Sequence, residues 1–184
     1  MGCTTSVEKG RNSSAPFHDA PQKQSPVDKR LPFTARDKFS LQKSWKAVQR
    51  SLNEVGTDAF LRIFKANPEY QDLFKDLKGQ SREQLIASLA FENQAAIMMN
   101  IFDELLEKLD DVDNMIAMLR EIGENHASYG VTVDMIKNFE EPFTKSIKEF
   151  LGDRYTENIE NLYSKFITFA FEEFCIGLKE ASLT

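Results

Sequence analysis

Apolar residues recur every three or four positions along nearly all of the chain after residue 33, and this spacing constrains the fold more than any other feature. It is clearest in residues 133–150 and 156–178. The first segment carries Ile136, Phe139, Phe143, Ile147 and Phe150, and the second carries Ile159, Tyr163, Phe166, Ala170 and Phe174. No segment alternates between apolar and polar residues as a half-buried strand would. The sequence therefore predicts an all-α fold.

Several residues indicate where the helices begin and end. Thr34, followed by Asp37, predicts an N-cap with an acidic first turn, and Pro68 suits the first turn of a short helix. Residues 82–109 show one continuous apolar pattern, which predicts a single long helix. The helix after it should stop at Tyr129–Val131, because Gly130 can adopt the left-handed conformation of a C-cap.

The first 33 residues differ in composition from the rest. They hold four of the six prolines among Ser, Gln, Asn and Lys, so we expect a flexible tail over residues 1–33 and one domain over residues 34–184. The net charge of -6 argues against nucleic acid as a partner. No apolar run approaches the roughly 20 residues that a bilayer-spanning helix needs. Cys3 and Cys175 lie far apart without a preceding signal peptide, which favours a reducing, cytosolic setting.

His126 is the only histidine after the tail, and it follows Met115, Leu119 and Ile122 on the apolar face of its helix. A neutral imidazole with one free nitrogen in apolar surroundings can bind iron or zinc. Because the chain offers no second cluster of His or Cys, the metal would have to bring its other ligands, as haem iron does. The 15 phenylalanines provide enough apolar bulk to enclose such a flat ligand. The competing interpretation is a hydrogen-bonded core histidine.

Gln94 is predicted on the same helix face as Met98, Ile101 and Leu105. A carboxamide in apolar surroundings is costly unless it has a hydrogen-bond partner, and a small ligand on a metal would supply one. A shift of one residue in the helical register would instead turn Asn93 inward.

The sequence resembles the globins over essentially all of residues 34–184. The elements that carry the resemblance are Ser44-Trp45, Asn67-Pro68-Glu69 with Phe74 after it, the segment with Gln94, Ile122-x-x-x-His126 with Gly130-Val131, and the two C-terminal helices. The resemblance implies the globin fold, a three-over-three helical sandwich, with haem b as cofactor. It makes His126 the proximal iron ligand, and we expect the carbonyl of Ile122 to accept a hydrogen bond from its second nitrogen.

By position, the resemblance places Phe74 on the haem face and makes Gln94 the distal residue. Phe60 would lie over the ligand site, and Met98 would lie one turn beyond Gln94. The further pocket residues that it implies are Ile122, Val131, Ile136, Phe139 and Phe143.

The chain departs from many globins because it has no distal histidine. Only His18 in the tail remains, so coordination by two histidines of the domain is excluded. Met98 or Gln94 is a candidate weak sixth ligand, but we expect an open or water-bound site. Lys78 and Tyr129 are candidate partners of the haem carboxylates.

The N-terminus, Met1-Gly2-Cys3-Thr4-Thr5-Ser6, fits the N-myristoylation pattern, and Cys3 beside Gly2 is a natural site for palmitate. Two acyl chains anchor a protein stably, whereas one holds it only marginally. With this start, the chain resembles the membrane-anchored globins of the globin X type. We expect it at the cytosolic face of the plasma membrane or of another membrane. A chance Met-Gly-Cys start is the alternative.

These features favour a haem-binding globin that reversibly binds oxygen or another diatomic ligand at a membrane. Redox signalling, oxygen sensing or electron transfer with a redox partner protein would suit it. The alternative is a haemless globin-fold interaction module, recruited to the membrane by its acylated tail. A dedicated enzyme is least favoured because Gln94 is a poor acid–base group, although nitrite reduction or peroxidase activity could accompany haem binding.

Overall fold

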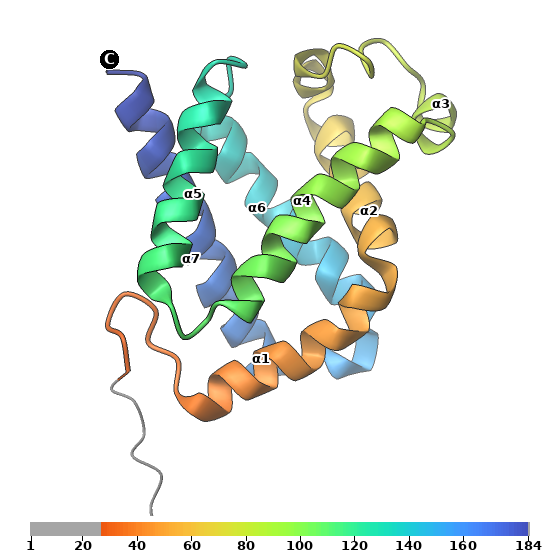
Figure 1. Cartoon of the computed structure of the whole chain (residues 1–184). Helices are drawn as coiled ribbons and strands as arrows, with labels where there is room; N and C mark the ends of the chain where they lie inside the picture. Colours follow the sequence, from red (N-terminus) through yellow and green to blue (C-terminus); the bar gives the residue numbers. More distant parts are fainter. Residues whose placement is uncertain (1–26, 184) are drawn as a thin grey trace, which may run out of the picture.

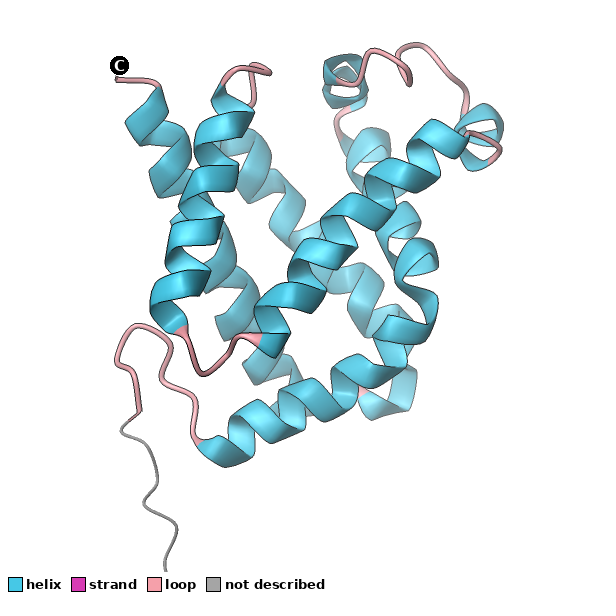
Figure 2. Ribbon diagram, viewed as in Figure 1, coloured by secondary structure: helices cyan, strands magenta, loops and turns pink. Residues whose placement is uncertain are grey.

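The computed structural model describes residues 27–183, and these residues form helices and loops without any strand (Figure 1 and Figure 2). The α-helices are α1 (Ala35–Val48), α2 (Leu52–Ala66), α3 (Arg82–Ile86), α4 (Leu89–Glu107), α5 (Val112–Ala127), α6 (Val133–Leu151) and α7 (Glu157–Ala181). Short 3-10 helices are η1 (Gln49–Ser51), η2 (Pro68–Leu73) and η3 (Gly152–Arg154). The predicted all-α class is confirmed.

The helices form two layers. In Figure 1, α1, α4 and α5 lie in front of α2, α6 and α7. The most extensive packing joins α5 to α7, while α2 contacts both α4 and α6, and α6 also contacts α7. This arrangement is the three-over-three sandwich that the sequence implied.

Local capping explains most of the helix boundaries. The Thr34 side chain accepts a hydrogen bond from the Asp37 backbone, and the Asp37 carboxylate accepts one from the Thr34 backbone, which completes a capping box. Pro68 begins η2, as predicted. Gly130 follows α5 with a φ of +77°, the left-handed conformation expected there.

The single helix predicted over residues 82–109 is wrong, because the chain turns at Ala87 and Ser88 between α3 and α4. The Ser88 hydroxyl caps α4 by accepting a hydrogen bond from the Phe91 backbone at 3.4 Å. Leu85 and Phe91 lie in the same buried cluster on either side of the turn, whereas Leu89 between them is exposed.

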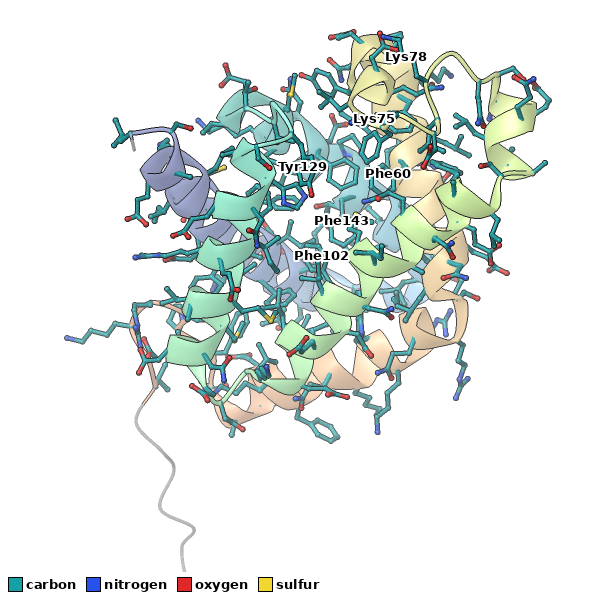
Figure 3. All side chains as sticks on the ribbon, turned by 45° about the horizontal axis from the view of Figure 1, so that its top comes forward. Phe60, Lys75, Lys78, Phe102, Tyr129 and Phe143 are labelled. Atoms are coloured by element: carbon teal, nitrogen blue, oxygen red, sulfur yellow. The ribbon has the colours of Figure 1, made fainter. Side chains whose placement is uncertain are left out.

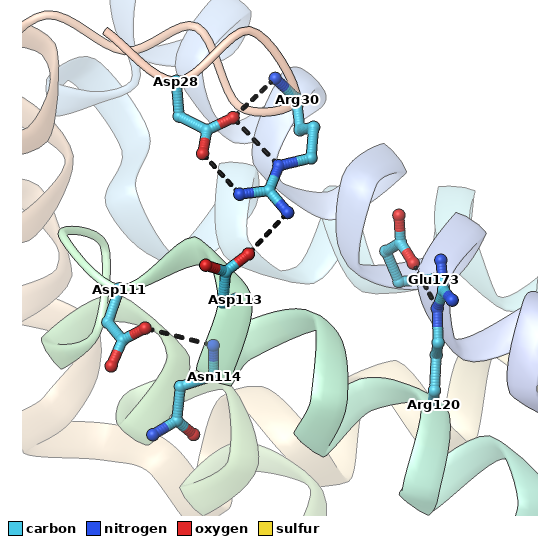
Figure 4. A network of polar contacts seen from close by, with 7 residues as sticks. All are labelled: Asp28, Arg30, Asp111, Asp113, Asn114, Arg120 and Glu173. Atoms are coloured by element: carbon cyan, nitrogen blue, oxygen red, sulfur yellow. Dashed lines mark hydrogen bonds and ion pairs between the residues drawn. The ribbon is translucent and has the colours of Figure 1, made fainter. Parts of the chain in front are cut away.

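The folded domain also begins earlier than residue 34. Leu31 and Phe33 are buried in the main core, so at least this part of the predicted tail belongs to the domain. Arg30 donates hydrogen bonds to Asp28 and to Asp113 at the start of α5, which ties this segment to the helices (Figure 4). Residues 1–26, which hold the rest of the predicted tail, lie outside the described residues.

Two glycines allow the backbones of α5 and α7 to approach closely. A Cβ atom on Gly123 would lie 2.1 Å from the carbonyl oxygen of Phe174, and one on Gly177 would lie 2.0 Å from that of Arg120. The Arg120 side chain donates a hydrogen bond to Glu173 at 2.8 Å across the same interface (Figure 4). This contact fixes the helix that carries His126.

Candidate functional site

The predicted site residues gather between α4 and α5, at the side of the domain opposite α1. Figure 3 shows Phe60, Phe102 and Phe143 in this region, with Tyr129 on one side and Lys75 and Lys78 on the other. Five elements contribute to it: α2, η2, α4, α5 and α6.

His126 is the last residue but one of α5 and is half-buried. Its Nδ1 atom is 2.7 Å from the carbonyl oxygen of Ile122, the acceptor expected from the sequence. A carbonyl oxygen can only accept, so Nδ1 must carry the proton and Nε2 keeps its lone pair. Nε2 has no hydrogen-bond partner among residues 27–183. The imidazole is therefore in the tautomer that can bind a metal through Nε2.

Two aromatic rings hold the imidazole in place. The ring of Phe174 in α7 lies 5.0 Å from that of His126, and the ring of Tyr129 lies 6.1 Å from it, both steeply inclined to the imidazole. Because Phe174 belongs to the close α5–α7 contact, the position of His126 depends on that contact.

Gln94 lies on α4 and is half-buried, whereas Asn93 is exposed, so the register with Gln94 inward is the one observed. Within the described part of the chain its amide makes no hydrogen bond. Met98, one turn later, packs against both buried clusters of the domain. An amide donor without a partner thus stands beside an apolar surface.

Four of the predicted phenylalanines form one connected aromatic group. The ring centroid of Phe60 lies 5.7 Å from that of Phe74 and 5.3 Å from that of Phe139. Phe139 stacks on Phe143 at 6.1 Å, and Phe143 is fully buried. The structure therefore brings α2, η2 and α6 together at this site.

Many of the site's apolar side chains remain partly exposed. The half-exposed ones from the predicted set are Phe74, Met98, Ile122, Val131, Ile136 and Phe139. Ile97 is 57% exposed, although it lies on α4 between Gln94 and Met98. An exposed apolar surface of this kind marks a binding site. A flat apolar ligand that carries a metal fits this surface, since it would cover these side chains and bind Nε2 of His126.

Lys75, Lys78 and Tyr129 lie at the border of the site (Figure 3). Lys78 forms an ion pair with Asp72 at 3.3 Å, whereas Lys75, also exposed at this border, forms no ion pair with a described residue. Tyr129 is 67% exposed. Lys75 and Ile97 were not among the predicted site residues.

Residues 27–183 contain no group of three or more His, Cys, Asp or Glu side chains that could hold a bare metal ion. His126 is thus a single ligand, and a metal bound to it needs a carrier for its other coordination positions.

Comparison with known proteins agrees with this geometry. A family model of the globins matches residues 57–174. Extracellular globin-E1 of Artemia sp. is 26% identical over 140 residues, which cover 76% of this chain and 72% of that protein. Cytoglobin-1 of Oryzias latipes is 28% identical over 110 residues, which cover 58% of this chain and 62% of that protein.

Solved structures show the same fold. A hexacoordinated haem protein from an anhydrobiotic tardigrade matches with a TM-score of 0.79 and 33% identity, over 83% of this chain and 99% of that chain. Ferric myoglobin of Aplysia limacina matches with a TM-score of 0.68 and 21% identity, over 81% and 98% of the two chains. Since the family model covers well over half of the sequence, this chain belongs to the globin family.

Proposed function

We propose that this globin holds haem b through Nε2 of His126 and reversibly binds oxygen or another diatomic ligand. The observation that carries the proposal is the hydrogen bond from His126 to Ile122, which leaves one imidazole nitrogen free beside a half-exposed apolar surface. Bound haem supplies an iron centre that can take a diatomic ligand and exchange one electron.

The side chains around the site have separate tasks. The Ile122 carbonyl holds the imidazole in one tautomer and orientation. Phe60, Phe74 and Met98 keep water away from the ligand site. The Gln94 amide donates a hydrogen bond at any pH, because it does not titrate.

The coordination state follows from the donors that the domain offers. The tardigrade relative is described as hexacoordinated. Here the second histidine, His18, lies outside the described residues, and only Gln94 and Met98 stand on the distal side. We infer an open or water-bound sixth position. Optical spectra of the reduced protein with and without carbon monoxide test this, since an internal sixth ligand would give a low-spin spectrum before carbon monoxide is added.

Haem titration of the wild type and of His126→Ala tests the proximal role. We expect the wild type to show an intense Soret band and the variant to lose most of its haem on gel filtration. Added imidazole should restore the spectrum of the variant by supplying the missing nitrogen. Unchanged haem retention in His126→Ala would refute the assignment. A colourless wild type with intact helicity would favour the haemless interaction module instead.

We also propose attachment to the cytosolic face of a membrane through myristate on Gly2 and palmitate on Cys3. Both residues lie outside the described residues, and the sequence motif supports the proposal. Among residues 27–183 no helix is long and apolar enough to cross a bilayer. After removal of Met1, the Gly2 amine would form an amide with a myristoyl group from an acyl thioester, releasing the thiol carrier. The Cys3 thiol would take a palmitoyl group from a second acyl thioester by thioester exchange, again releasing the thiol carrier.

Fractionation of cells that express the wild type, Gly2→Ala or Cys3→Ser tests this attachment, with mass spectrometry of the N-terminal peptide. We expect the wild type in the membrane fraction and both variants shifted toward the soluble fraction. Equal solubility of all three would contradict it. At a membrane surface the haem suits redox signalling, oxygen sensing or electron transfer to a partner protein better than bulk oxygen transport.

A further inference from the structure

One face of α1 presents a line of cations with a single aromatic ring among them. Its members are Arg36, Phe39, Lys43, Lys46 and, in the adjoining η1, Arg50. The spacing of three and four residues places them within an arc of about 80° on the helix. We call these five residues the α1 outer face. They lie on the side of α1 opposite the buried side chains Leu41, Trp45 and Val48.

Ion pairs are absent from the α1 outer face, as far as residues 27–183 are concerned. None of its four cations forms an ion pair with a described residue, whereas Lys38 on the same helix pairs with Asp110 at 2.6 Å. Asp37 is the only acidic residue of α1, and it is engaged in the capping box with Thr34. Four cations without an ion pair in the described structure therefore gather along α1 and η1, in a chain whose net charge is -6.

The aromatic member is unusually exposed. Phe39 is 63% exposed, and the Lys43 ammonium lies 5.9 Å from the centroid of its ring. A helix face with basic residues around an aromatic ring is suited to the boundary between lipid headgroups and acyl chains. Asp103 and Glu107 of α4 lie beside this face in a groove shared with Phe39, Lys43 and Lys46. Asp103 accepts hydrogen bonds from Trp45 and Gln49. Of the two carboxylates in this groove, only Glu107 makes no hydrogen bond with a described residue.

The described chain also begins on this side of the molecule. Figure 1 shows the first described residues near the start of α1, while η2 and the α5–α6 connection lie at the opposite edge. Arg30 holds this segment against the first turn of α5 through Asp113. An anchor near residue 2 would therefore join the domain on its α1 side.

We propose that the α1 outer face docks on an anionic lipid bilayer. The four cations meet lipid phosphates and carboxylates, and Phe39 enters the headgroup region. The haem site opens at the opposite side of the domain, between Tyr129 and Lys75, so it faces the aqueous phase (Figure 3). This orientation favours a soluble redox partner over direct contact between haem and lipid. The inference complements the acyl anchor but does not require it, because the helix face can be tested on the unacylated chain.

The test is co-sedimentation of the full chain, made without acylation and loaded with haem, with phosphatidylcholine vesicles with and without phosphatidylserine. We expect binding only to the anionic vesicles, and weaker binding at higher salt. Each cation near such a surface contributes about a five-fold increase in partitioning, so removing four should reduce it by two orders of magnitude or more if they act independently. The docking variant combines Arg36→Gln, Lys43→Gln, Lys46→Gln and Arg50→Gln.

A matched control makes the same change in charge on other faces of the domain. This control variant combines four substitutions of exposed residues: Lys65→Gln, Arg82→Gln, Lys145→Gln and Lys179→Gln. We expect the control to retain most of its vesicle binding, and Phe39→Ala to lose part of it with all four cations still present. Equal loss in both quadruple variants, or no preference of the wild type for anionic vesicles, would overturn the proposal. Capture of the wild type by an acidic protein without any vesicle binding would overturn it too.

These outcomes are independent of the proposed function. The Soret band reports haem binding, mass spectrometry of the N-terminal peptide reports acylation, and vesicle partitioning of the unacylated chain reports the α1 outer face. Since all eight substituted side chains are exposed, circular dichroism should show unchanged helicity in both quadruple variants.

Discussion

Substitution of Gly177 by alanine should destabilise the domain, although alanine is the better helix former. The new Cβ atom would lie 2.0 Å from the carbonyl oxygen of Arg120, 2.6 Å from its carbonyl carbon and 2.7 Å from its Cα. All three are backbone atoms of α5, so no side-chain rotation can relieve the contact. The two helices must move apart.

The size of the effect follows from this geometry. Ordinary van der Waals contact begins near 3.4 Å, so the shortest contact must lengthen by about 1.4 Å. Overpacking of a well-packed core costs about 1–3 kcal/mol, and more where the backbone must shift. Alanine returns about 0.5–1 kcal/mol through helix propensity. We expect a net loss of about 2 kcal/mol, which lowers the melting temperature by about 4–8 °C for a domain of this size.

Thermal unfolding of Gly177→Ala followed by circular dichroism measures this loss. Ser164→Ala is the control, because Ser164 is exposed on the same helix and should change stability only slightly. A second measurement is haem transfer to a stronger acceptor. It should be faster in Gly177→Ala, since His126 packs on Phe174 across the same contact. If Gly177→Ala melts at or above the wild-type temperature, helix propensity governs this position and the close contact between the two backbones is wrong.

Three further substitutions test other parts of the structure. Gln94→Leu removes the hydrogen-bond donor predicted on the distal side. Oxygen dissociation measured by stopped flow should become about tenfold faster, which corresponds to the loss of one hydrogen bond. An unchanged rate would mean that the amide does not bond the ligand. The buried Tyr155 hydroxyl is the one such side-chain atom without a hydrogen-bond partner among the described residues, so Tyr155→Phe should raise unfolding stability by about 1 kcal/mol in urea at neutral pH. Burial also raises the pKa of Tyr155 to about 12. The unfolding free energy of the wild type should therefore be constant below pH 10.0 with respect to this group, and should fall as the pH rises from there toward about 12. The Tyr155→Phe variant should not show this fall. Asp103 accepts hydrogen bonds at 2.7 Å from Trp45 and Gln49, and Asp103→Ala should cost about 1–3 kcal/mol by leaving the buried indole N–H unpaired, whereas a cost near zero would mean that water replaces the carboxylate.

Helix positions could be predicted from the sequence wherever the signal is local. The capping box at Thr34 and the left-handed Gly130 depend on residues within one turn, and both were predicted. The turn at Ser88 was missed because Leu85 and Leu89, four residues apart, suggest one helix face, although Leu85 is buried and Leu89 is 70% exposed. Apolar spacing alone does not show whether the backbone between two such residues stays helical.

Long-range contacts could not be predicted from one sequence. A hydrogen bond from His126 to the carbonyl of Ile122 is predictable because the two residues lie four apart on one helix. Which of Lys75 and Lys78 can reach a group bound in the site depends instead on the path of the loop after η2. There the Gln71 amide donates hydrogen bonds to the carbonyls of Leu77 at 2.6 Å and Gln80 at 3.0 Å, and no local pattern indicates these bonds.

The packing of α5 differs from one side of the helix to the other. Toward α7, Gly123 allows backbone contact, and the ion pair of Arg120 with Glu173 adds a polar link. The apolar side chain of Ile122 stays half-buried, as does the imidazole of His126 beyond its contact with Phe174 of α7. Burying Ile122 completely would stabilise the fold, yet this side of α5 stays partly uncovered. That cost is explained if another molecule covers this face, and the free Nε2 of His126 makes a metal-bearing one the best match.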